Sequence, residues 1–165
     1  MKLKPLTMVA AATCFVIAGV ALTMVTGLWQ TESDKTPRAL KQMDAETASV
    51  QGAETVYDPA DIRGSYTFGE VSTLFGVPLA DLAEAFGLDA AAAAAFQVKS
   101  LETLAPSPDV ELGTASFRLF VAYYTGLPYE PTEEVSLPAS AVQVLSAHGN
   151  LTAERLAYLA AHTFP

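Results

Sequence analysis

The sequence TFGEVSTLFGVPLADLAEAFGL at residues 67–88 decides the fold class, because it encodes two short helices with start and stop signals. Thr67 and Glu70 have the spacing of a capping box, in which each residue satisfies a free amide at the start of the helix. Gly76 is placed to end the first helix, and Pro78 is placed to open the second. The stretch therefore predicts a helix–turn–helix pair rather than strands.

Further helices are predicted on both sides of a proline-rich segment, each from a cap residue and apolar residues at helical spacing. They cover residues 90–95, 100–104, 114–124 and 138–147, with a last helix capped by Thr152. The expected caps are Asp89 for the helix over residues 90–95 and Thr114 for the helix over residues 114–124. The expected buried stripes are Phe117, Phe120, Val121 and Tyr124 in the third helix, and Leu156, Leu159 and Ala160 in the last.

Alternation with a period of two is nearly absent, so strands have little support in the sequence. Tyr57 and residues 96–98 are the only candidates for short strands. We therefore expect an all-α fold, with a compact domain of short helices.

Residues 6–28 form an uninterrupted apolar run without a charged residue. A helix rises about 1.5 Å per residue and the hydrocarbon core is about 30 Å thick, so about 20 apolar residues cross it. The run is longer than the apolar region of a secretory signal peptide, and no small-residue cleavage site follows it. Trp29 then suits the headgroup level. We therefore expect a single N-terminal transmembrane helix that is retained as an anchor rather than cleaved.

The basic flanks of this run predict its orientation. Lys2 and Lys4 favour a cytoplasmic amino end, whereas three basic residues on the other flank (Lys35, Arg38 and Lys41) oppose it. A short amino end before a single span fits a signal-anchor that exports its carboxyl side. The predicted location is the cytoplasmic membrane, single-pass, with the C-terminal domain extracytoplasmic.

Cys14 is the only cysteine and lies inside the apolar run, after Thr13. A bacterial lipoprotein cysteine would instead end the run and follow a small residue such as Gly or Ala, so Cys14 is interpreted as a small hydrophobe in lipid. A single cysteine also excludes an intramolecular disulfide, a four-thiolate zinc site and a self-contained iron–sulfur cluster.

The distribution of apolar, polar and acidic residues divides the chain into three parts. The net charge is −9, and residues 57–165 carry all of it, with thirteen acids against four basic residues. We expect a membrane anchor at residues 1–29, a polar tether at 30–56 and an acidic helical domain at 57–165. Within the tether, Pro37 can open a short helix over residues 38–49. The acidity is explained either by solubility or by a docking face for a basic partner, and it opposes contact with nucleic acid.

Residues 70–82 have the outline of a DNA-binding helix-turn-helix, but their chemistry opposes that function. The second helix, which would read the DNA, offers Asp81 and Glu84 and no basic residue. Base and phosphate contacts require donors and positive charge. The pair is therefore predicted to be a packing motif.

No motif in the chain predicts a catalytic residue, a metal or a cofactor. His148 and His162 lie near helix carboxyl ends, where a cation offsets the helix dipole, and their spacing does not suit a metal. An acidic loop contains Glu130, Glu133 and Glu134 without the alternation that a calcium loop needs. Phosphate-binding loops and nucleophile elbows are also lacking, although a Ser–His–acid triad formed only in three dimensions stays open.

Arg63 and Arg118 are the charged residues most suited to a special role. Arg118 lies in the most apolar predicted helix, and Arg63 precedes a glycine at the entrance to the first helix of the pair. Either can pair with an acid such as Asp61 and fasten the fold. The other interpretation is that one of them is exposed and holds a ligand.

Several short strings resemble a small helical module of membrane-bound ferredoxin-like proteins, a group related to the membrane ferredoxins of nitrate-reductase systems. These strings are DIRG (61–64), TFGEV (67–71), GVP (76–78), GL (87–88) and VKSL (98–101), followed by Arg118. The resemblance covers about residues 61–124. In that group the module accompanies transmembrane helices and four-iron clusters. This chain lacks the cluster-binding cysteines, so the resemblance implies association with a membrane redox complex rather than electron transfer.

Together these patterns predict a non-catalytic, membrane-anchored accessory protein that contacts the bilayer and a membrane protein complex. The alternative is a small-ligand-binding module or an enzyme whose site forms only in three dimensions. A deep polar pocket at Arg118 or Arg63 would favour the alternative, and a flat acidic or apolar patch would favour an accessory protein.

Overall fold

The computed structural model describes residues 36–40, 56–107 and 110–165. It divides the chain into two units, residues 1–35 and 36–165, and the second holds every described residue. The predicted anchor and most of the predicted tether therefore lie outside the described residues. Within the described ranges, no helix has the length and apolar character needed to cross a membrane.

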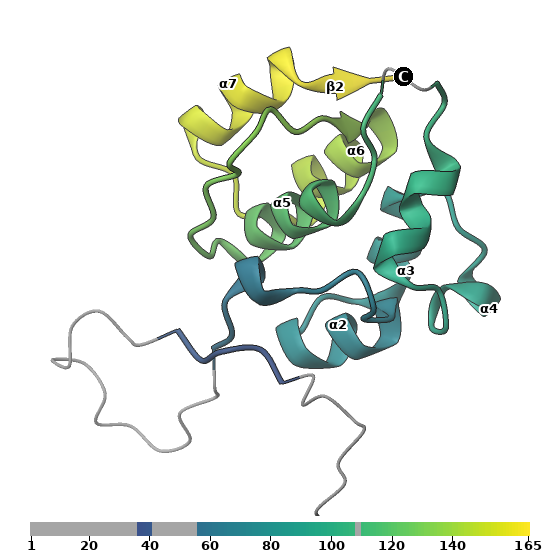
Figure 1. Ribbon diagram of the computed structural model, residues 1–165. Helices are drawn as coiled ribbons and strands as arrows, with labels where there is room; N and C mark the ends of the chain where they lie inside the picture. The colour runs from purple at the N-terminus through teal and green to yellow at the C-terminus, as the bar shows by residue number, and fades with distance from the viewer. Residues whose placement is uncertain (1–35, 41–55, 108–109) are drawn as a thin grey trace, which may run out of the picture. The chain divides into compact units, whose positions relative to one another are not determined.

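The second unit is mostly helical, which confirms the predicted all-α class (Figure 1). Its elements, with η marking 3-10 helices, are η1 (Pro59–Asp61), α2 (Phe68–Phe75), α3 (Leu79–Ala85), α4 (Ala90–Ala93), η2 (Val98–Leu104), α5 (Thr114–Thr125), β1 (Leu137–Pro138), α6 (Ala139–His148), α7 (Ala153–Ala161) and β2 (Thr163–Phe164). β1 and β2 pair in parallel, with Leu137 opposite Thr163.

The capping box at the start of α2 is confirmed. The Glu70 amide donates to Thr67 Oγ1 at 3.2 Å, and the Thr67 amide donates to the Glu70 carboxylate at 2.7 Å. At the other end, Gly76 ends α2 with a φ of 67°, in the left-handed region where glycine has no steric penalty. Both boundaries of α2 are therefore set by local sequence signals.

Thr67→Ala should lower the free energy of unfolding by about 1 kcal/mol, because the Glu70 amide loses its acceptor. Thr103→Ala is the control, since the Thr103 hydroxyl donates to the Ser100 carbonyl on the exposed face of η2. That change should stay within about 0.5 kcal/mol. Urea unfolding followed by circular dichroism measures both values. Equal losses in the two variants would show that the capping box does not stabilise α2.

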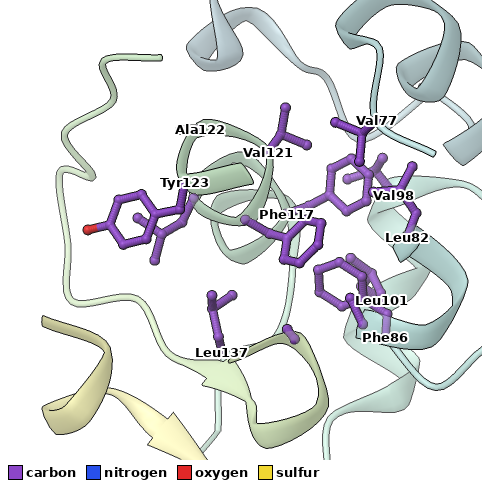
Figure 2. Packing of buried hydrophobic residues seen from close by; sticks show 14 of the residues in the cluster. Val77, Leu82, Phe86, Val98, Leu101, Phe117, Val121, Ala122, Tyr123 and Leu137 are labelled. Carbon is purple, nitrogen blue, oxygen red and sulfur yellow. The ribbon is translucent and has the colours of Figure 1, made fainter. Parts of the chain in front are cut away.

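Helix α5 supplies the centre of the core. It packs against α6, η1 and η2, and α3 packs against α6. In Figure 2, Phe117 points toward side chains from α3 and η2, while Tyr123 extends from the other side of α5. The Phe117 ring centroid lies 4.6 Å from that of Phe68 and 5.4 Å from that of Phe86. In the predicted stripe, Phe117, Phe120 and Val121 are fully buried and Tyr124 is half-buried. The helix also buries Leu119, Ala122 and Tyr123, so it is covered on more sides than the predicted stripe.

Some predicted helix details are wrong. Gly113, rather than Thr114, is the cap of α5. In α7 the predicted buried face is only partly correct, because Leu159 is buried but Leu156 is 49% exposed and Ala160 is also exposed. The face of α7 that turns inward carries Arg155, whose guanidinium reaches carbonyls near the end of α5. A polar contact therefore sets the orientation of α7, which apolar spacing alone does not reveal.

The candidate strand residues form isolated bridges. Tyr57 pairs with Ala39, and Gln97 pairs with Thr67, both in antiparallel fashion. The bridge at Ala39 makes residues 36–40 extended, so they do not begin the predicted helix over 38–49; residues 41–49 of that prediction lie outside the described residues.

Candidate functional site

Arg118 ties two distant segments of the chain together. It is half-buried on α5, and its Nε donates to the carbonyl of Ile62 at 2.8 Å. Ile62 follows η1 and is fully buried. The bond fixes the end of η1 against α5, which agrees with the interpretation of Arg118 as a residue that fastens the fold, although its partner is a carbonyl rather than an acid.

A small cavity lies beside Arg118, between the start of α5 and the acidic loop. It has a volume of about 70 Å³, and Ser116 and Tyr129 are among its lining residues. Three exposed acids also line it, namely Glu111, Glu133 and Glu134. Sites for small organic ligands usually have about 300–1,000 Å³. The Arg118 cavity is therefore too small for such a ligand and suits water or a small ion.

Asp61 pairs with Arg38, which was not predicted. Two guanidinium nitrogens of Arg38 donate to the two Asp61 carboxylate oxygens at 2.8 Å each, and the Arg38 amide donates to Oδ2 at 2.8 Å. These bonds from Arg38, with a smaller effect from its charge and that of Arg63, lower the pKa of Asp61 to about 2. Arg63 itself is exposed at the entrance to α2. Asp61 thus holds residues 36–40 against the domain through Arg38.

Arg38→Ala should raise the pKa of Asp61 from about 2 toward its ordinary value of 3.8. The pKa of Asp61 is lower in the folded chain than in the unfolded chain, so its pair with Arg38 stabilises the fold at pH values above 3.8. This contribution is lost as the pH falls through about 2. NMR titration of the Asp61 carboxyl carbon measures the shift. Lys99→Ala, an exposed change elsewhere, should leave the titration unaltered. An Asp61 midpoint that stays near 2 in Arg38→Ala would contradict the assignment.

Asp81 is the centre of a second polar cluster, which joins three helices. Its Oδ2 accepts from the Tyr124 hydroxyl at 2.6 Å and lies 2.8 Å from His148 Nδ1. Burial, with a further effect from Asp81, raises the pKa of Tyr124 to about 12. His148 remains exposed in the last turn of α6, so it lies at a helix carboxyl end as predicted and also meets a carboxylate. The cluster positions a histidine ring at the surface with one nitrogen held by an acid.

His162 belongs to a separate contact at the end of α7. Its ring stacks on that of Tyr158, with centroids 4.1 Å apart, and its Nδ1 lies 2.8 Å from the Tyr158 carbonyl oxygen. The Tyr158 hydroxyl in turn donates to the Val135 carbonyl at 3.2 Å. Both histidines thus have structural partners. Across the described ranges, no three His, Cys, Asp or Glu side chains gather in a way that could hold a metal.

An open groove lies where α2 and α5 both end. We call it the α2–α5 groove; its volume is about 260 Å³, and it is lined by Val56, Tyr57, Thr73, Leu74, Phe75, Gly76, Thr125 and Leu127. Val56 is 39% exposed, and the other apolar lining residues are half-buried. The sequence did not predict this groove, because the groove joins Val56 and Tyr57, which precede η1, to residues at the ends of α2 and α5.

Comparisons of the chain with models of protein families, with curated proteins and with solved structures find no match. The resemblance to membrane-bound ferredoxin-like proteins therefore stays a prediction.

Proposed function

We propose that this chain is a non-catalytic accessory protein that anchors an acidic helical domain in the cytoplasmic membrane. Residues 6–28 form the retained transmembrane helix, and the C-terminal domain lies outside the cytoplasm. The domain binds a membrane protein complex, and the resemblance around residues 61–124 suggests a redox complex. The bilayer and this complex are the proposed partners.

This proposal rests on the contrast between the Arg118 cavity and the α2–α5 groove. The Arg118 cavity has only about 70 Å³, whereas the α2–α5 groove has about 260 Å³, is more open, and is lined mainly by apolar and aromatic side chains. Exposed apolar patches on soluble domains are typical of sites that contact other macromolecules. The groove thus supports an interaction protein, and the small cavity gives little support to a site for an organic ligand at Arg118.

A second candidate function is an enzyme, and the Asp81 cluster is the observation that favours it. A carboxylate on Nδ1 orients a histidine ring, as in sites where the other ring nitrogen acts as a base. His148 is exposed and has this partner at 2.8 Å. The cluster also has a sufficient structural role, since it joins α3, α5 and α6, so we place this candidate second.

Membrane extraction tests the anchor. The full-length chain should remain in the membrane pellet after a carbonate wash, and its intact mass should include Met1 or begin at Lys2. Protease added to the outside of spheroplasts should remove the domain while leaving a cytoplasmic control protein intact. A soluble product that starts near Gln30 would contradict the proposal, and so would a domain that only lysed cells expose to protease.

A further inference from the structure

We propose that the α2–α5 groove binds a basic, amphipathic peptide segment of the partner, in which leucine-like side chains alternate with lysine or arginine. This inference rests on the proposed function, because it names the chemistry of the partner that an accessory domain would hold. It is argued from the walls of the groove, from the charge at its end and from its size.

Five of the eight residues that line the groove have apolar or aromatic side chains, and the other three are two threonines and a glycine. The ring of Tyr57 packs edge-on against that of Phe75, with centroids 6.3 Å apart, which fixes one wall. A Cβ added to Gly76 would meet no atom within 4 Å, so the space above the end of α2 is open. Apolar side chains of a partner can therefore enter and bury surface, at about 25 cal/mol per Å² of apolar area removed from water.

The end of α2 gives one end of the groove a partial negative charge, although none of the described acidic side chains lines the groove. The last carbonyls of a helix carry a partial negative charge, and α2 has no basic residue in its last turn. The end of α5 differs, because Arg155 donates to the carbonyls of Gly126 and of Leu127, which lines the groove. Residues 57–165 add thirteen acids against four basic residues. A positively charged residue of the peptide, next to one of its apolar side chains, is thus favoured at the end of α2.

The size of the groove favours a peptide over a compact ligand. Its volume of about 260 Å³ is below the usual range of small-molecule sites, and it is partly open to solvent. Peptide segments use such grooves by inserting a few anchoring side chains while the remaining residues stay in solvent. The groove thus fits a segment with a few apolar anchors and flanking cations.

Thr73→Lys tests the charge argument without removing any wall of the groove. Thr73 is exposed in the last turn of α2, where a lysine favours the helix but repels a cationic peptide. Thr103→Lys is the matched control. Both threonines are exposed, each hydroxyl donates to a carbonyl of its own helix, and both changes add the same charge. Only Thr73 lines the groove.

The probe is a fluorescent ten-residue peptide of alternating lysine and leucine, titrated against the full-length chain in zwitterionic micelles. Anisotropy is compared with that in empty micelles. Thr73→Lys should weaken peptide binding about fivefold, a change that corresponds to about 1 kcal/mol, while Thr103→Lys should change it less than twofold. A peptide with serine in place of leucine should lose the binding.

Equal weakening by both substitutions would overturn the inference, because it would show attraction to the overall charge rather than to the groove. Binding of the serine peptide as tightly as the leucine peptide would also overturn it. So would a chain that self-associates through the groove, seen in light scattering as a dimer that Thr73→Lys dissociates. Membrane retention is measured separately, so failure of the anchor and failure of the groove are distinguishable.

Discussion

Phe117→Ala should lower the free energy of unfolding of the domain by about 3–5 kcal/mol, the largest effect that we expect from a single substitution. The Phe117 side chain is fully buried, and its ring contacts those of Phe68 and Phe86. Alanine would leave a cavity shared by three helices, which can close only in part. Since small domains have total stabilities of about 5–15 kcal/mol, this loss would remove a large part of the stability of the domain.

Leu156→Ala is the matched control for Phe117→Ala. Both changes truncate an apolar side chain in a helix, but Leu156 is 49% exposed. Its effect should stay within about 0.5 kcal/mol. Urea unfolding of the full-length chain in micelles, followed by circular dichroism, measures both. A small loss in Phe117→Ala, or an equal loss in Leu156→Ala, would show that α5 does not supply the centre of the core.

Arg155→Met should cost about 2 kcal/mol, the second largest effect. The Arg155 guanidinium lies 4.9 Å from the centroid of the Tyr123 ring. It also donates to four carbonyls, those of Ala122, Gly126, Leu127 and Asn150. Methionine keeps much of the aliphatic stem but removes every donor, so the carbonyls lose their charged partner and the ring loses its cation. The start of the loop that follows α5 should loosen, because Arg155 joins Gly126 and Leu127 to α7.

Hydrogen exchange and urea unfolding test this role of Arg155. Amide protection around residues 126–127 and at the start of α7 should fall in Arg155→Met, whereas Lys99→Met, at an exposed position, should leave both stability and exchange unchanged. Unchanged protection in Arg155→Met, together with a stability equal to that of the original chain, would show that Arg155 does not hold α7 against the end of α5.

The helix boundaries could be predicted because their signals are local. Thr67 and Glu70 meet within one helical turn, and Gly76 and Gly126 take left-handed conformations directly after a helix. Such signals act whatever the rest of the chain does. The burial of α7 could not be predicted in the same way, because Leu156 satisfies the helical spacing of a core residue as well as Leu159 does.

The polar contacts could not be predicted because they join residues that are distant in sequence. Asp61 bonds Arg38 across 23 positions, and Asp81 bonds Tyr124 and His148 across 43 and 67 positions. An acid has many candidate partners at such separations, and only the packing of the helices selects one. The α2–α5 groove likewise joins Tyr57, Phe75 and Leu127, which are distant in sequence.

We propose that the anchored domain docks to a membrane protein complex, and purification of the tagged full-length chain in mild detergent at low and at high salt tests this. We expect one defined membrane complex in stoichiometric amount at low salt, and its release as salt rises, because exposed charges are screened over about 8 Å at physiological ionic strength. Recovery of the chain alone at every salt concentration, together with a small molecule that raises its melting temperature saturably, would show that the domain binds a small ligand instead.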